Sequence, residues 1–180
     1  MIEGRSLARA ELDRIWEIDR TEVTETVYAI VDGTLTLRRQ HHDLKGWPPG
    51  EAEKYTPILV DCFDRGGWFH GLFDGEKLLG VAVLDGRFIG GDRRQLQLAF
   101  LHVSSGYRDR GLGRRLFRLA ADEARRRSAR SLYISATPSQ HTVDFYRGRG
   151  CVVARVPDPQ LFELEPEDIH LECDLAPGRM

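Results

Sequence analysis

The feature that most constrains the fold is a strand that leads through a glycine-containing loop into a long amphipathic helix and a second strand. Residues 95–103 alternate between polar and apolar positions, as in a strand with two different faces. The helix runs from Gly111 to about Ser128, and its apolar stripe consists of Leu112, Leu116, Leu119, Ala120 and Ala124. Because a right-handed helical crossover joins parallel strands, the strands at 95–103 and 131–136 are expected in one sheet.

The remaining patterns predict further hairpins, helices and strands. Asp32-Gly33 and Asp74-Gly75 each separate two β-rich segments, and Asp-Gly is a strong signal of a hairpin turn. The predicted strands are 27–31, 34–37, 68–73, 76–84, 151–156 and 169–175, and the predicted helices are 10–19, 51–64 and 139–149. Residues 41–50 and 87–94 are predicted loops, and Asp158-Pro159 is expected to break the chain. This order predicts an α/β fold with a mixed, mostly antiparallel central sheet flanked by helices.

Length, charge and cysteine spacing exclude several classes of protein. A chain of 180 residues is long enough for one domain. The formal net charge is −2, so no overall field attracts nucleic acid or an anionic membrane. The N-terminus has no apolar leader, and no apolar run approaches the ~20 residues of a membrane span. Cys62, Cys151 and Cys173 are widely spaced and lack a CxxC pattern, which predicts reduced thiols in a cytoplasmic protein.

The chemistry signal lies where the strand at 95–103 meets the long helix. Gly111 and Gly113 stand in a loop just as the helix begins, so several backbone N–H groups have no acceptor within the helix. These groups and the positive end of the helix dipole form an anion site that suits a pyrophosphate. A lone GxG pattern is equally often found where a turn into a helix needs glycine for steric reasons alone. The loop lacks the Gly-Lys-Ser/Thr of a Walker loop and the GxGxxG of a dinucleotide fold, so ATP or NAD binding is a weak alternative.

Two motifs together resemble one family. The sequence Arg108-x-x-Gly111-x-Gly113 looks like the acetyl-CoA signature (Arg/Gln-x-x-Gly-x-Gly/Ala) of the GNAT superfamily of N-acetyltransferases. The later segment Ser135–Cys151, which contains Phe145-Tyr146, resembles the strand, helix and Phe-Tyr-x-x-x-Gly-Phe segment of that superfamily. The resemblance covers about residues 68–156. It implies a single domain over residues 1–180, with a substrate-side part at 1–67 that holds a hairpin insertion, an acetyl-CoA-binding core at 68–156, and a C-terminal strand within 157–180.

The resemblance also implies roles for individual residues. The strand before the loop would pair its backbone with the pantetheine arm of acetyl-CoA, and the backbone amides of the loop would hold the pyrophosphate. Ser139 stands where many members have an asparagine that contacts the pantetheine arm. Tyr146 matches a tyrosine near the cofactor sulfur and would protonate the leaving thiolate. The cofactor-binding residues expected from the resemblance are Leu101, His102, Val103, Arg108, Asp109, Arg110, Gly111, Leu112, Gly113, Arg114, Ser139 and Tyr146.

The general base is the part of the site that the sequence leaves open. Histone-type members carry a catalytic glutamate on the strand before the loop, and the matching residue here is Gln97, which cannot accept a proton. Candidates are His102, Asp19 and Glu22, and the last two follow the first helix, where such enzymes usually contact substrate. Each has a structural alternative: a strand histidine packed among apolar residues, or a solvated helix end.

The expected function is transfer of an acetyl group from acetyl-CoA to a primary amine of a small molecule or peptide by direct attack, without a metal. The alternative is a non-catalytic acyl-CoA-binding or regulatory module, which Gln97 would favour and Tyr146 would not. Trp47 and Trp68 could line a substrate pocket, although packing is their usual role. The acceptor, the acyl-chain preference and the choice between monomer and homodimer stay open.

Overall fold

The computed structural model describes residues 1–176, and its contacts group the chain into two compact units. The first unit contains residues 1–22, 44–87 and 98–123, and the second contains 23–43, 88–97 and the chain from Ala124 onward. Hydrogen bonding orders the main strands as β1-β4-β5-β6-β7-β9-β8, and β2 pairs with β3 in a separate ribbon. The predicted α/β class with a mixed, mostly antiparallel sheet is therefore confirmed.

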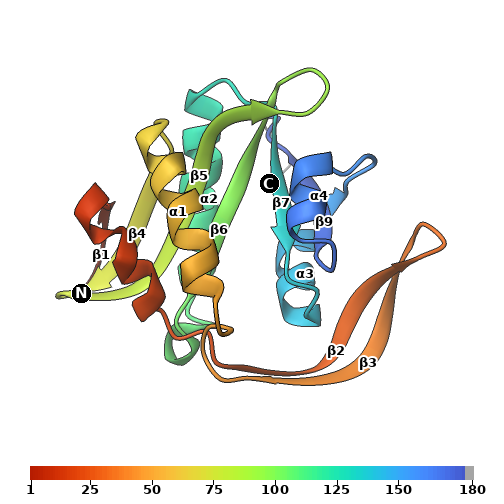
Figure 1. Cartoon of the computed structure of the whole chain (residues 1–180), viewed down its shortest axis with the longest axis horizontal. Helices are drawn as coiled ribbons and strands as arrows, with labels where there is room; N and C mark the ends of the chain where they lie inside the picture. Colours follow the sequence, from red (N-terminus) through yellow and green to blue (C-terminus); the bar gives the residue numbers. More distant parts are fainter. Residues whose placement is uncertain (177–180) are drawn as a thin grey trace. The chain divides into compact units, whose positions relative to one another are not determined.

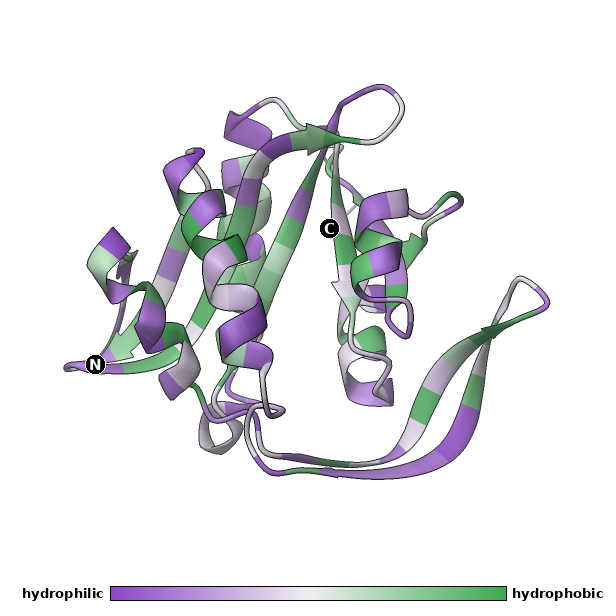
Figure 2. Ribbon diagram, in the orientation of Figure 1, coloured by the Kyte–Doolittle hydropathy of each residue, from purple (hydrophilic) through white to green (hydrophobic). Residues whose placement is uncertain are grey.

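The first unit is a sheet covered by helices on both faces (Figure 1). Its elements are β1 (Ile2–Ser6), the 3₁₀ helix η1 (Arg9–Glu17), α1 (Glu51–Asp64), β4 (Trp68–Asp74), most of β5 (Lys77–Ile89), most of β6 (Gln95–Val103), the 3₁₀ turn η2 (Ser105–Tyr107) and most of α2 (Leu112–Arg126). Four consecutive side chains of β5, from Val81 to Leu84, are fully buried. A strand can bury successive residues only when both of its faces are covered, and the hydrophobic colour along β5 agrees with this (Figure 2).

The second unit contains a long ribbon and the C-terminal half of the chain. Its elements are β2 (Glu22–Val31), β3 (Thr34–Leu44), β7 (Ser131–Ala136), α3 (Gln140–Arg147), β8 (Val152–Val153), α4 (Pro159–Leu164) and β9 (Ile169–Asp174). The start of β6 pairs in parallel with β7 through Gln95 and Ser131, and β9 runs antiparallel to β7. The ribbon turns at Asp32 and Gly33, whose φ angles of 49° and 75° fit the predicted hairpin turn.

Several boundaries differ from the sequence prediction for identifiable reasons. The ribbon extends to Leu44, because the polar residues of β3 keep strand pairing although they lack an alternating pattern. Only Val152 and Val153 of the predicted strand at 151–156 pair with β9. Asp158-Pro159 does not simply break the chain: the Asp158 carboxylate accepts hydrogen bonds from the N–H groups of Gln160 and Leu161, and α4 begins at Pro159. Proline is favoured at this first helical position.

One prediction about the cysteines is wrong. Cys151 and Cys173 form a disulfide, and only Cys62 carries a free, buried thiol. The strand register accounts for the pairing: Val152 lies opposite Glu172, so the residues next to them, Cys151 and Cys173, come together. The sequence spacing of 22 residues does not reveal this register. Burial raises the pKa of the Cys62 thiol to about 12, so this side chain behaves as a small apolar group in the core.

Candidate active site

The glycine-containing loop leaves β6 and turns into α2 as the sequence predicts. The Ser104 N–H still donates to the Leu79 carbonyl at 2.8 Å, and the one-turn helix η2 follows. Asp109 and Gly111 then adopt left-handed backbone angles, with φ of 59° and 79°. The Arg115 N–H donates to the Gly111 carbonyl at 3.0 Å. The N–H groups at 112–114 precede that bond, so the first turn of α2 has N–H groups available for an anion.

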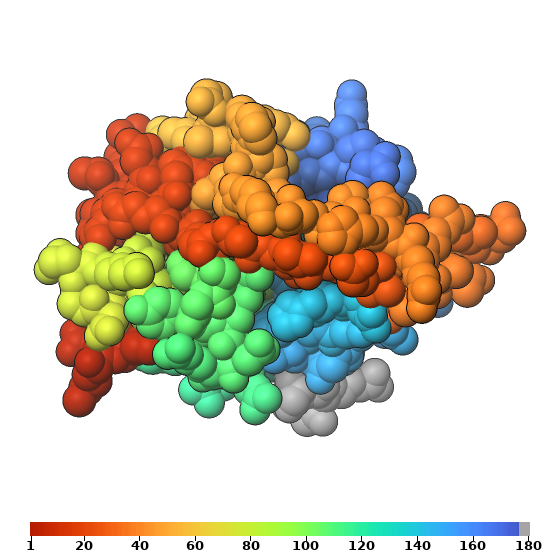
Figure 3. Space-filling view, turned by 90° about the horizontal axis from the view of Figure 1, so that it is seen from below, coloured from red at the N-terminus to blue at the C-terminus, as the bar shows by residue number. Residues whose placement is uncertain are grey.

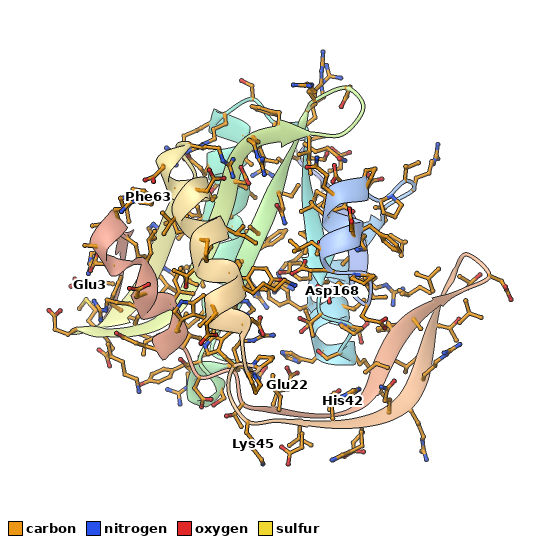
Figure 4. The ribbon with its side chains drawn as sticks, viewed as in Figure 1. Glu3, Glu22, His42, Lys45, Phe63 and Asp168 are labelled. Atoms are coloured by element: carbon orange, nitrogen blue, oxygen red, sulfur yellow. A yellow bond between two sulfur atoms is a disulfide. The ribbon has the colours of Figure 1, made fainter. Side chains whose placement is uncertain are left out.

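The side chain of Arg108 fastens this loop instead of extending from it. Its Nε donates to the Val103 carbonyl and its Nη1 donates to the Thr21 carbonyl, both at 3.2 Å. The Glu22 carboxylate lies 4.0 Å from the same Nη1. The signature arginine thus joins the end of β6 to the segment that follows η1, which contains the two predicted substrate residues. Figure 4 labels Glu22 at the start of β2.

Asp19 makes a second connection between the same two segments. Its carboxylate accepts hydrogen bonds from the Ser105 hydroxyl and from the Thr21 N–H, and its own N–H donates to the Ser104 hydroxyl at 3.1 Å. The Ser105 N–H also donates to the Asp19 carbonyl at 2.9 Å. The Ser105 and Thr21 hydrogen bonds lower the pKa of Asp19 to about 2. A carboxylate of such low basicity that is already accepting hydrogen bonds is a poor proton acceptor, so its role here is to hold the loop.

A set of rings from four parts of the first unit packs beside His102; Trp16, Trp47, Tyr55, Phe100 and His102 are called the aromatic cluster below. The ring centroids of Trp47 and His102 are 5.0 Å apart, and those of Phe100 and His102 are 5.3 Å apart. Both indoles are held by hydrogen bonds, because the Trp47 Nε1 donates to the Ile18 carbonyl and the Trp16 Nε1 donates to the Thr56 hydroxyl. These hydrogen bonds fix both indoles, and Trp47 is one of the two rings that contact His102.

Two arginines set the electrostatic environment of His102. Arg20 lies over the Trp47 ring, 4.6 Å from its centroid, and forms a 2.9 Å ion pair with Glu51. Burial lowers the pKa of His102 well below its usual value, and the positive charges of Arg20 and Arg108 lower it further. The imidazole is consequently neutral at pH 7. A neutral imidazole has one nitrogen that can accept a proton.

Ser139 and Tyr146 belong to the second unit. Ser139 is buried and caps α3: its hydroxyl accepts from the Thr142 N–H and donates to the Thr142 hydroxyl. Tyr146 lies on α3 beside Phe145, and burial raises the pKa of its phenol. The phenol is therefore protonated at pH 7, the form that can donate a proton. Gln97 lies in the parallel pair with β7, opposite Tyr133.

The structure brings together most of the residues expected from the sequence. Asp19, Glu22, the end of β6 and the whole loop from Arg108 to Arg114 belong to the first unit. Figure 3 shows the green segment around residues 100–110 at the molecular surface. Sequence reasoning missed the cluster of Trp16 and Phe100 and the serine contacts of Asp19. The single available signal was Trp47, an aromatic residue in a loop rich in glycine and proline.

No group of three or more His, Cys, Asp or Glu residues within residues 1–176 is arranged to hold a metal ion. No helix in the same range is long and apolar enough to cross a membrane.

Comparisons with known proteins place this geometry in a family. Residues 34–151 match the acetyltransferase (GNAT) family, and this segment contains the loop, α2 and α3. None of the curated proteins compared with the chain matches it. Similar solved structures include nourseothricin acetyltransferase, with 21% identity, a TM-score of 0.70, and coverage of 97% of this chain and 99% of that chain.

Two further structures share the fold over nearly the whole length of both proteins. The PaiA N-acetyltransferase from Thermoplasma acidophilum, in complex with coenzyme A, is 18% identical with a TM-score of 0.65, covering 97% and 99% of the two chains. The ribosomal-protein-S18-alanine N-acetyltransferase from Escherichia coli is 18% identical with a TM-score of 0.61, covering 100% and 99%. These likenesses establish the fold, and the family match covers well over half of the chain: it belongs to the acetyltransferase (GNAT) family and is an acyltransferase.

Proposed function

We propose that the protein transfers an acetyl group from acetyl-CoA directly to a primary amine of a small molecule or peptide. The observation that carries the proposal is the loop from Val103 to Arg114, which leads into α2 so that the N–H groups at 112–114 precede the first hydrogen bond of the helix and can bind an anion. A pyrophosphate there would accept charge-assisted hydrogen bonds, each worth about 1.5–3 kcal/mol. The loop lies inside the segment that matches the family, and the similar PaiA protein holds coenzyme A.

The roles assigned to the residues follow from the chemistry of thioester aminolysis. A neutral amine attacks the thioester carbonyl, its nitrogen loses a proton, and a thiolate leaves. An alkylamine with a pKa near 10.4 must first lose a proton to water, at a cost of about 4.6 kcal/mol at pH 7. Tyr146 donates a proton to the leaving thiolate in this proposal, and the backbone of Leu101 to Val103 pairs with the pantetheine arm. Ser139 is expected to contact that arm through its backbone, because its hydroxyl already caps α3.

The proposal names one acyl donor, acetyl-CoA, but a broad class of acceptors. One similar protein is named for nourseothricin, a small molecule, and another for the alanine of a ribosomal protein. Both names are compatible with an amine acceptor, which is why the proposal includes small molecules and peptides. Family membership favours the enzyme over the non-catalytic acyl-CoA-binding module, although Gln97 replaces the glutamate of histone-type members.

The test is acetyl-CoA-dependent thiol release over a panel that contains nourseothricin, spermidine, free lysine and peptides with a free N-terminus. Turnover on at least one acceptor is expected, and Tyr146→Phe should reduce kcat by on the order of 10²-fold or more. The matched control is Tyr28→Phe, the same change at a tyrosine of β2. Acetyl-CoA binding without acetylation of any amine would support the binding module instead. Absence of acetyl-CoA binding would refute the proposed donor.

A further inference from the structure

We propose that His102 is the general base that accepts the proton from the attacking amine. This inference rests on the proposed function and adds the proton acceptor that Gln97 cannot supply.

The contacts of His102 leave its ring nitrogens available. Within residues 1–176 the imidazole contacts the rings of Trp47 and Phe100, and neither of its nitrogens makes a hydrogen bond. The core imidazole of His170 differs: Nδ1 accepts from the Tyr133 hydroxyl at 2.8 Å, and Nε2 donates to the Glu165 carbonyl at 3.1 Å. His102 is held by ring contacts instead, which fix its orientation while keeping both nitrogens free to exchange protons.

The position of His102 matches the place where a proton must be removed. It stands two residues before Ser104, where the phosphate-binding loop begins. Side chains alternate across a strand, so Phe100 and His102 share the face of β6 that the aromatic cluster covers, while Leu101 and Val103 face the other side. The backbone of Leu101, His102 and Val103 is the expected partner of the pantetheine arm. His102 therefore places an imidazole next to the strand segment that would carry the thioester.

The ionisable groups that face His102 favour a neutral imidazole. Arg20 and Arg108 contribute positive charge, and each is paired with a carboxylate, Glu51 and Glu22 respectively. Both arginines and the burial of the ring act in the same direction, toward a lowered pKa. The imidazole is thus in its proton-accepting form throughout the neutral range.

The competing bases are already occupied. Both carboxylate oxygens of Asp19 accept hydrogen bonds, and the pKa of this group is lowered to about 2. Glu22 lies beside the Arg108 guanidinium at 4.0 Å. Among the three candidates from the sequence, His102 alone combines a neutral nitrogen with ring contacts that leave both nitrogens without a hydrogen bond.

The proposed step balances in atoms and charge. The nitrogen lone pair of the neutral amine forms an N–C bond to the thioester carbonyl carbon, and the carbonyl π electrons move to oxygen. The nitrogen, now positively charged, transfers one proton to the free ring nitrogen of His102. The C=O bond re-forms as the C–S bond breaks, and the thiolate takes a proton from Tyr146 in its proposed role. The imidazolium then returns its proton through solvent to the phenolate, so the net change moves one proton from nitrogen to sulfur.

The experiment compares the pH dependence of kcat/KM for wild type and His102→Gln, with the best acceptor from the panel above. Two groups must lose a proton at low pH, the free amine and His102. Below the pKa of His102, a plot of log kcat/KM against pH should therefore rise with slope 2 in wild type, and with slope 1 at higher pH. His102→Gln should show slope 1 throughout and a loss of about 10²–10³-fold near pH 7. Its dissociation constant for acetyl-CoA, measured by calorimetry, should stay within about twofold.

The matched control is His42→Gln, at an exposed histidine of β3 that Figure 4 labels; it should keep the wild-type profile. A second variant, His102→Ala, should regain activity when imidazole is added, which a purely structural histidine would not produce. A wild-type profile in His102→Gln, or no rescue of His102→Ala, would overturn the assignment while leaving the proposed function intact. No thiol release by wild type with any acceptor would overturn both.

Discussion

At the scale of single residues, the loop at 103–114 depends on backbone angles that few side chains tolerate. Gly111 has a φ of 79°, and a Cβ at this position would meet no atom within 4 Å. Glycine is therefore required by the backbone conformation and not by crowding. Gly106, in the same loop, also has open space around it but lacks a positive φ. Substitutions at Gly111 and Gly106 can therefore distinguish the effect of backbone strain from the effect of losing a glycine.

Gly111→Ala should lower the free energy of unfolding by about 1–2 kcal/mol, the cost of a left-handed backbone in a residue with a Cβ. Acetyl-CoA should also bind less tightly, because relief of the strain moves the N–H groups of the loop. Denaturant unfolding and calorimetry measure the two effects. Gly106→Ala is the control and should change neither by more than about 0.5 kcal/mol. Equal effects of the two changes would argue against backbone strain at Gly111.

The hydrogen bonds of Asp19 predict a dependence of stability on pH. Its folded pKa of about 2 lies below the ordinary value of 3.8, so the carboxylate stabilises the folded state above pH ~4 and this contribution is lost as pH falls toward 2. Asp19→Asn should be less stable than wild type at pH 5–7, and the difference should shrink to zero between pH 4 and 2. Because Asp19 is exposed, the effect at neutral pH should be at most about 1 kcal/mol.

Denaturant midpoints of wild type and Asp19→Asn across this pH range test the prediction. Asp13→Asn, at an exposed aspartate of η1, is the control and should follow wild type. A constant difference between Asp19→Asn and wild type down to pH 2 would show that the charge of Asp19 is not the stabilising feature.

At the scale of elements, the contacts at the two ends of α3 hold short segments of the second unit. The N-terminus of α3 depends on the Ser139 hydroxyl, which accepts from the Thr142 N–H, and the ribbon reaches the same place through a bridge between Val27 and Ser139. The two-residue strand β8 is attached to β9 by its register and by the disulfide of Cys151. Helix α3, which carries Tyr146, thus lies between a side-chain cap and a covalent bond.

Ser139→Ala should remove the cap and lower the free energy of unfolding by about 1 kcal/mol. For a chain of this length that corresponds to a fall in Tm of roughly 2–4 °C. Ser139→Asp keeps a capping oxygen and should recover most of the loss. Thermal unfolding measures both variants, and the KM for acetyl-CoA should respond to the serine hydroxyl only through this cap. A higher KM in Ser139→Asp at unchanged stability would assign the hydroxyl itself to the cofactor.

The disulfide predicts a loss of stability on reduction. A bond that closes a loop of 22 residues restricts the unfolded chain by roughly 3 kcal/mol. Cys151→Ser, or a thiol reductant, should lower the free energy of unfolding by about that amount, whereas reductant should have no effect on the Cys151→Ser variant. Denaturant unfolding with and without reductant is the measurement. Alkylation of unfolded, unreduced protein should label Cys62 alone, and labelling of all three cysteines would contradict the bond.

At the scale of the whole molecule, periodic patterns predicted the elements that carry the most buried surface. The boundaries of α1 and β6 agree with the sequence prediction, because their apolar residues follow the helical and strand periods. β1 was missed, since Ile2–Ser6 shows no apolar alternation and is defined by its pairing with β4. The loop at 108–114 could be predicted because its glycines lie close to one another in the sequence. The aromatic cluster was not, because it joins residues as distant as Trp16 and Phe100. The extent of one domain over 1–180 stays a prediction.

The anchoring of Arg108 has a consequence for how the signature motif tolerates replacement. The guanidinium donates to two backbone carbonyls, those of Val103 and Thr21, and the groups proposed to bind the anion are backbone N–H groups of the loop. A side-chain amide also carries two N–H donors but no charge. The resemblance allows either arginine or glutamine at this position. The geometry supplies a reason, because the side chain is needed to hydrogen-bond the two backbone carbonyls and not to bring a positive charge to the phosphate. Arginine and glutamine can then replace each other because either side chain can donate to the two carbonyls, whatever its charge.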